Sequence, residues 1–251
     1  MNADHSLAAS IATEAGRLLL AVRAELADAD AGVLRKEGDR RSHDEICRLL
    51  AVARPDDAVL SEEAVDDPVR LRSRRVWIVD PLDGTREFSE PPRVDWAVHV
   101  ALWEEGELVA GAVALPGMGE TLATGAGAPS LAPPVAGPPR LVVSRTRPPL
   151  LVQGLVERLG ADVVPMGSAG AKAMAVLRGE ADAYVHAGGQ YEWDSAAPVA
   201  VARAAGLHTS RVDGSPLVYN RPDPLLPDLV VCRPELSSTL LEAIAELGST
   251  G

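Results

Sequence analysis

The residues with the clearest chemical potential form one short stretch, Asp80-Pro81-Leu82-Asp83-Gly84-Thr85. It follows a continuous apolar run at residues 75–79, which predicts a buried strand with functional groups at its carboxyl end. Pro81 and Gly84 favour a turn there, so we expect both carboxylates on that turn. Buried carboxylates repel one another, and Mg²⁺ relieves the repulsion because it prefers oxygen ligands. The pattern therefore indicates a cation site with room for water and phosphate.

Two further acidic sites follow other predicted elements. Glu62 and Glu63 end a short strand at residues 58–60, and Asp194 begins an alanine-rich helix. Each site alone has an ordinary structural explanation, such as a solvated strand end, a helix N-cap or a plain Asp-Pro turn. Carboxylates from three separate elements that converge instead match a two-metal phosphatase, in which ions about 3.5–4 Å apart flank an in-line displacement.

Three motifs in order carry a resemblance to a known family. They are Ser61-Glu62-Glu63, the stretch from Trp77 to Thr85, and Trp193-Asp194-Ser195-Ala196-Ala197. Together they resemble the inositol monophosphatase superfamily of magnesium-dependent, lithium-inhibited phosphatases. The resemblance implies two or three Mg²⁺ ions in each site. It also implies a layered α-β-α-β-α sandwich and a homodimer.

Within that superfamily the chain is most similar to bacterial 3′(2′),5′-bisphosphate nucleotidases of the CysQ type. The similarity lies in Arg86-Glu87-Phe88 and in Gly167-Ser168-Ala169-Gly170-Ala171-Lys172. Inositol enzymes of the superfamily carry a sugar-binding glutamate seven positions before the Trp-Asp aspartate, where this chain has Ala187. The resemblance therefore favours a nucleotide substrate over a simple sugar phosphate.

The resemblance also implies a role for each matched acidic position. Glu62 would bind the first metal ion, and Asp80 would bridge both ions. Leu82 would coordinate through its backbone carbonyl group. Asp83 and Asp194 would hold the second ion.

Water activation is expected to depend on Thr85 and an upstream aspartate. We choose Asp39 for that partner because it precedes Glu62 by 23 residues and is predicted to begin a helix. Asp44 is the second choice, and it could equally be a solvated helix residue. Thr85 alone is a poor base, so a carboxylate or a metal ion must assist it.

The phosphate is expected to bind the backbone N–H groups of Gly84 and Thr85, at the start of a short helix. Lys172 is a candidate for a second phosphate, although a lysine in mid-helix is most often solvated. Gln190 and Tyr191 could contact a base or sugar, or form an ordinary loop. The predicted substrate contacts are Glu62, Gly84, Thr85, Arg86, Ser168, Lys172, Gln190 and Asp194.

The implied reaction is hydrolysis of the 3′-phosphate of adenosine 3′,5′-bisphosphate (PAP) to AMP and phosphate, which would clear a by-product of sulfate assimilation. Inositol monophosphate or fructose 1,6-bisphosphate is the alternative substrate, because the same metal core serves all three. Two other hypotheses stay open: a non-catalytic sensor of metal and nucleotide, and a protein whose acids are only helix and strand caps.

Composition limits the possible partners. The chain has 251 residues, with 24 Lys and Arg against 36 Asp and Glu, for a formal net charge of −12. Such acidity argues against a nucleic-acid polymer or an anionic membrane surface as the partner. Cys47 and Cys232 show no metal-binding spacing, and we find neither a signal peptide nor a membrane-spanning segment. We therefore expect a cytoplasmic enzyme of small phosphate esters with reduced thiols.

The elements that must position these residues form two halves. Residues 1–137 predict an α+β half with most of the metal ligands: a helix over residues 7–26 capped by Ser6, a polar turn at residues 35–39, a second helix capped by Asp39, and several strands. Proline-rich residues 129–149 mark the boundary. Residues 138–251 then alternate between strand and helix and predict an α/β half with Asp194 and the substrate contacts.

Overall fold

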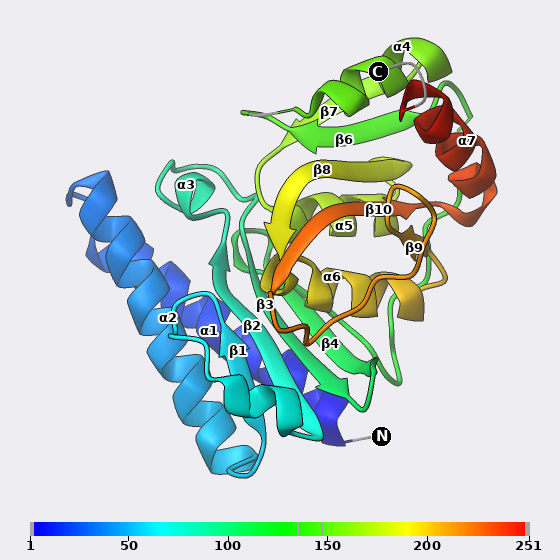
Figure 1. Ribbon diagram of the computed structural model, residues 1–251. Coiled ribbons are helices and arrows are strands. Elements are labelled where there is room, and N and C mark those ends of the chain that lie inside the picture. Colours follow the sequence, from blue (N-terminus) through cyan, green and yellow to red (C-terminus); the bar gives the residue numbers. More distant parts are fainter. Residues whose placement is uncertain (1–2, 135, 147, 249–251) are drawn as a thin grey trace.

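The computed structural model describes residues 3–134, 136–146 and 148–248. Its helices and strands form five layers in the order α-β-α-β-α (Figure 1). Helices α1 (Ala3–Glu25) and α2 (Ala31–Ala53) make the first outer layer. The apolar positions of α1 recur every three or four residues and are buried, which explains why this amphipathic sequence covers a sheet.

The first sheet lies beneath these two helices and has the order β1-β2-β3-β4-β5. Its strands are β1 (Ala58–Ser61), β2 (Arg75–Asp83), β3 (Ala97–Glu104), β4 (Glu107–Leu115) and β5 (Glu120–Ala123). β1 runs parallel to β2, and the other neighbours are antiparallel. β2 lies inside the sheet, between β1 and β3, and is buried from Val76 to Asp83, as its continuous apolar sequence predicts.

The carboxyl end of β2 differs from the prediction. The strand does not turn after Val79 but continues to Asp83, and its register with β3 shifts between Asp80 and Asp83. Pro81 has no N–H group to donate to the ladder, so a bulge at this point keeps the pairing on either side. The turn follows at Gly84, whose φ of 85° is in the left-handed region, and the short helix α3 (Thr85–Phe88) begins there.

The second sheet has the order β7-β6-β8-β10-β9. Its strands are β6 (Arg140–Ser144), β7 (Asp162–Met166), β8 (Ala183–Tyr191), β9 (His208–Ser210) and β10 (Leu225–Cys232). Helices α5 (Ala169–Leu177) and α6 (Glu192–Ala204) lie between the two sheets, and α4 (Leu150–Leu159) and α7 (Ser237–Gly248) cover the outer face (Figure 1). Three short 3₁₀ helices, at Pro68–Arg72, Pro116–Met118 and Pro234–Leu236, complete the elements.

Two predicted helix starts are wrong. α1 already includes Ala3, so Ser6 lies inside the helix. The N-cap of α2 is Asp30, whose side chain accepts the N–H of Gly32, and Asp39 lies in mid-helix.

The charged stretch before Asp39 suggested a turn because it combines a glycine with solvated side chains. In the structure Glu37 pairs with Arg40 and Arg41 on the exposed face of α2. Gly38 instead faces the core, where an added Cβ would lie 2.7 Å from a ring carbon of Phe88. The glycine therefore permits close helix packing and does not end a helix.

Among the described residues, no helix is both long and apolar enough to cross a membrane. Cys47 on α2 and Cys232 on β10 are both free thiols within this part of the chain.

Candidate metal and phosphate site

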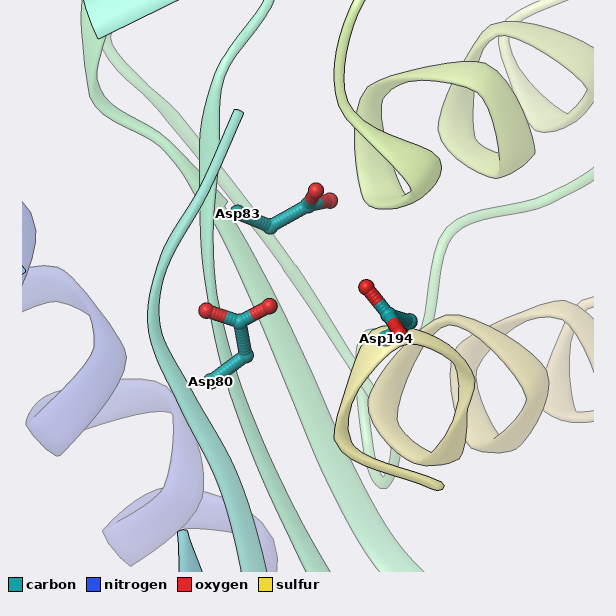
Figure 2. A group of neighbouring side chains, drawn as sticks. All are labelled: Asp80, Asp83 and Asp194. Atoms are coloured by element: carbon teal, nitrogen blue, oxygen red, sulfur yellow. The ribbon is translucent and has the colours of Figure 1, made fainter. Parts of the chain in front are cut away.

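Three aspartates from separate places in the sequence meet at one point. Asp80 and Asp83 lie at the end of β2, and Asp194 lies in the first turn of α6 (Figure 2). One carboxylate oxygen from each lies within 4.8 Å of the others. The predicted convergence of Asp80, Asp83 and Asp194 is thus seen in the fold.

Glu62 lies just after β1, the parallel neighbour of β2, so it reaches the same edge of the sheet. Its carboxyl group lies close enough to Asp80 for that residue to lower its pKa. Burial, then the charge of Asp194, raises the pKa of Glu62 to about 7, with further contributions from Asp83 and Asp39. Glu62 therefore borders the three aspartates, although the residue as a whole is exposed to solvent.

The same crowding raises the pKa of two of the aspartates. Burial raises the pKa of Asp80 well above its ordinary value, and the charges of Glu62, Asp83 and Asp194 add to the effect. Burial and the charge of Asp83 raise the pKa of Asp194 to about 6. These donors are all carboxylate oxygens, which suit a hard divalent cation, and their mutual repulsion is what such a cation relieves. The residues present therefore fit Mg²⁺.

Asp83 differs because hydrogen bonds surround it. It accepts the backbone N–H groups of Ala169 (3.1 Å) and Gly170 (2.7 Å) at the start of α5. Its Oδ2 also accepts the Ser168 hydroxyl at 2.5 Å. Burial alone would raise the pKa of Asp83, but the neighbouring His99, the charge of Lys172 and the Ser168 hydroxyl hold it at about 2. Asp83 is therefore a carboxylate held in one orientation.

His99 contributes to this orientation and is absent from the sequence predictions. It lies fully buried on β3, with Nε2 3.2 Å from Asp83 Oδ2 and Nδ1 3.0 Å from the carbonyl oxygen of Trp193. Burial lowers its pKa and the contact with Asp83 raises it, with a net rise. His99 thus connects one aspartate to the backbone next to Asp194. Its only sequence signal was its place in an alternating strand.

Thr85 and Asp39 are brought together as predicted. The Thr85 hydroxyl lies 3.1 Å from the carbonyl oxygen of Leu82 and 3.5 Å from Asp39 Oδ1. Burial and the charge of Glu63 raise the pKa of Asp39 to about 7, against the lowering effect of Thr85. A general base is most effective when its pKa is near the working pH. Asp44 is instead exposed and paired with Arg40 at 2.9 Å.

A cavity of about 340 Å³ opens beside the aspartates. Its lining residues include Asp83, Gly84, Arg86, Lys172, Gln190 and Asp194. Lys172 is not solvated in mid-helix: its residue is 5% exposed, and its ammonium group donates to the carbonyl oxygens of Gly167 and Ser168. Ser168 gives its single hydroxyl hydrogen to Asp83, so in this structure it orients that carboxylate.

A buried polar network supports the start of α6. The carboxylate of Glu192 accepts the backbone N–H groups of Asn220 (2.6 Å) and Arg221 (2.8 Å). The fully buried Arg70 donates to Asn220 Oδ1 (2.8 Å), to the Arg221 carbonyl oxygen (2.9 Å) and to Asp66 (2.6 Å). The network connects the segment that follows Glu62 to the helix turn that carries Asp194. No motif in the sequence indicated this network.

Comparison with known proteins places this site in a family. The profile described as "Inositol monophosphatase family" matches residues 4–249. The chain is 54% identical over 244 residues to a Mycobacterium bovis protein named 3′-phosphoadenosine 5′-phosphate phosphatase, covering 93% of this chain and 90% of that one. It is 33% identical over 193 residues to the Escherichia coli 3′(2′),5′-bisphosphate nucleotidase CysQ, covering 72% and 77% of the two chains.

A solved structure extends the comparison to the fold. Inositol monophosphatase II from Staphylococcus aureus superposes with a TM-score of 0.81 at 20% identity, over 96% of each chain. At that level of identity the similarity concerns the fold, and it agrees with the predicted layered sandwich.

Proposed function

Because the chain belongs to the inositol monophosphatase family, we propose that it is a Mg²⁺-dependent phosphatase that hydrolyses the 3′-phosphate of PAP to AMP and phosphate. One observation supports the proposal most strongly. Asp80, Asp83 and Asp194 meet beside a cavity, and Lys172 lines that cavity. The mycobacterial relative that bears the PAP phosphatase name is 54% identical to this chain.

In this proposal the acidic side chains hold the metal ions. Glu62, Asp80, the Leu82 carbonyl group, Asp83 and Asp194 are the ligands, for two or three Mg²⁺ ions. When bound, Mg²⁺ lowers the pKa of a water nucleophile and neutralises charge on the phosphoryl group. Residues 1–137 supply most of these ligands, and residues 138–251 supply Asp194 together with the substrate contacts Lys172 and Gln190.

The chain's own residues move the proton. Thr85 Oγ1 accepts a proton from the attacking water and passes its own proton to Asp39. The half-buried Asp39, with a pKa of about 7, is able to take that proton near neutral pH. The water oxygen then bonds to phosphorus as the bond from phosphorus to the 3′ oxygen breaks, and that oxygen takes a proton from solvent water to become the 3′ hydroxyl group of AMP.

In this proposal backbone and side-chain groups around the cavity hold the substrate. The N–H groups of Gly84 and Thr85 bind the reacting phosphate, and Arg86 and Lys172 supply positive charge for an anionic substrate in a chain of net charge −12. Gln190 is a further contact. Ala187 has no carboxylate to bind sugar hydroxyl groups, which supports a nucleotide over an inositol phosphate.

Comparative kinetics test this assignment. We expect kcat/KM for PAP to exceed that for inositol 1-phosphate and fructose 1,6-bisphosphate, and we expect Li⁺ to inhibit. A value for PAP no higher than for the sugar phosphates contradicts the nucleotidase assignment. A wild-type protein that binds PAP without turnover, with unchanged binding by Asp80→Asn, supports a sensor instead.

We also propose a cytoplasmic setting in sulfur metabolism and a homodimer. The two free cysteines are compatible with a reducing compartment. The dimer rests on family resemblance, and light scattering of the purified protein tests it.

A further inference from the structure

In the side-chain amide of Gln190 the nitrogen is hydrogen-bonded, and the oxygen has no partner among the described residues. Its Nε2 donates to the hydroxyl of Tyr184 at 2.8 Å, which fixes the orientation of the amide. Its Oε1 is buried and has no hydrogen-bond partner among the described residues, and the residue is only 7% exposed. A buried acceptor without a donor is costly, so a ligand that supplies a donor here gains affinity.

This acceptor belongs to a side chain that lines the cavity beside the acidic cluster. Gln190 and Tyr184 line the same cavity as Asp83 and Asp194. The ammonium nitrogen of Lys172 lies 5.2 Å from the centre of the Tyr184 ring. An unpaired acceptor beside carboxylates repels phosphate oxygens and favours a neutral donor. A hydroxyl group on the carbon next to the phosphorylated carbon meets that requirement.

Tyr191, the residue after Gln190, presents an aromatic surface to the same cavity. The Tyr191 ring stacks on Trp193 with a centroid distance of 4.7 Å and an interplanar angle of 6°. Tyr191 is 46% exposed and lines the cavity, whereas Trp193 packs against the core behind it. The backbone N–H of Tyr191 donates to Asp194 Oδ2 at 2.7 Å, which places Tyr191 at the edge of the acidic cluster. Flat aromatic bases stack on such rings with little sequence preference.

We propose that Gln190 and Tyr191 form a nucleoside subsite that selects nucleotides over other phosphate esters. Gln190 Oε1 accepts a hydrogen bond from the sugar hydroxyl next to the scissile phosphate, and the exposed face of Tyr191 stacks on the base. The inference rests on the proposed phosphatase function and names the part of the substrate that each residue recognises.

The role of Gln190 is tested by removing the hydroxyl group from the substrate and the amide from the enzyme. The wild-type protein should have a kcat/KM for PAP roughly 10- to 100-fold higher than for 2′-deoxyadenosine 3′,5′-bisphosphate, which lacks the hydroxyl group. Gln190→Leu should lower kcat/KM for PAP and bring the two substrates close together. Equal hydrolysis of both by the wild type, or a preference retained by Gln190→Leu, overturns this role.

The role of Tyr191 is tested with and without a base on the substrate. Tyr191→Ala should lower the ratio of kcat/KM for PAP to that for inositol 1-phosphate by roughly 5- to 100-fold. Tyr191→Phe keeps the ring and should keep the ratio. An equal loss on both substrates contradicts stacking and indicates a general effect on the site.

Calorimetry with AMP separates this inference from the proposed function because it needs no turnover. Tyr191→Ala should weaken AMP binding by a similar factor, and Tyr191→Phe should not. If the wild type fails to hydrolyse PAP, the proposed function is wrong, and the AMP measurement still decides the subsite. AMP binding that Tyr191→Ala leaves unchanged overturns the subsite.

Discussion

Neutralising Asp80 should stabilise the metal-free protein. Asp80 is fully buried, and the carboxylate oxygens of Asp83 and Asp194 lie within 4.8 Å of its own. At an effective dielectric constant of about 20, two charges at that separation repel by about 3–4 kcal/mol. Asp80→Asn removes the charge but keeps an oxygen for the Leu82 N–H, which Asp80 now accepts at 3.0 Å.

The gain in stability from Asp80→Asn should increase as the pH rises. The folded state raises the pKa of Asp80, so it holds a proton that the unfolded chain releases, and the stability of the wild type falls as the pH rises. Keeping that proton costs about 1.4 kcal/mol for each pH unit above an ordinary pKa of about 3.9, and the cost stops growing once the folded carboxyl ionises, where it equals the repulsion of about 3–4 kcal/mol. We therefore expect Asp80→Asn to add about 2–4 kcal/mol to the free energy of unfolding at pH 8 and about 1 kcal/mol at pH 5.

Urea unfolding in EDTA at both pH values measures this effect. Asp44→Asn is the matched control, because Asp44 lies on the exposed face of α2 and should change stability by no more than about 0.5 kcal/mol. With Mg²⁺ added, the order should reverse, since the wild type binds the ion and the variant loses a ligand. A variant no more stable than the wild type at pH 8, or an equal gain at both pH values, would refute the reasoning.

Three further predictions follow from individual contacts. Thr85→Ala should lower kcat for PAP by roughly 10²- to 10⁴-fold, and Thr85→Ser should restore most of it, as steady-state kinetics will show. Gly38→Ala places a Cβ 2.7 Å from Phe88 and should cost about 1–3 kcal/mol of stability in urea unfolding. Arg70→Met removes the buried cation near Glu192, should destabilise the fold by about 3–5 kcal/mol and should raise the Mg²⁺ concentration for half-maximal activity. An unchanged Mg²⁺ requirement would show that Arg70 serves only the fold.

The acidic site was predictable because strand ends are visible in the sequence. The apolar run before Asp80 predicts a buried strand, and groups at the carboxyl ends of parallel strands share one edge of a sheet. Glu62 follows one of these strands, and Asp80 lies near the carboxyl end of the other. Asp194 was harder to place, because only the resemblance related its helix to that edge.

Predictions from local sequence patterns were wrong or missing where a residue's role depends on tertiary packing. Gly38 resembled a turn signal, yet it lies in mid-helix against Phe88. Three-residue β9 was missed because so short a strand has no readable period. His99 and Arg70 hold partners 94 to 151 positions away, and such pairs leave no signal in one sequence.

Cleavage of PAP by this protein should require divalent ions held by these carboxylates, and comparing phosphate release in EDTA with release in added Mg²⁺ tests this requirement most directly. We predict no release of phosphate from PAP in EDTA and full recovery on addition of Mg²⁺, with AMP as the other product. Hydrolysis that continues at the same rate in EDTA, or an absence of turnover at saturating Mg²⁺, would contradict it.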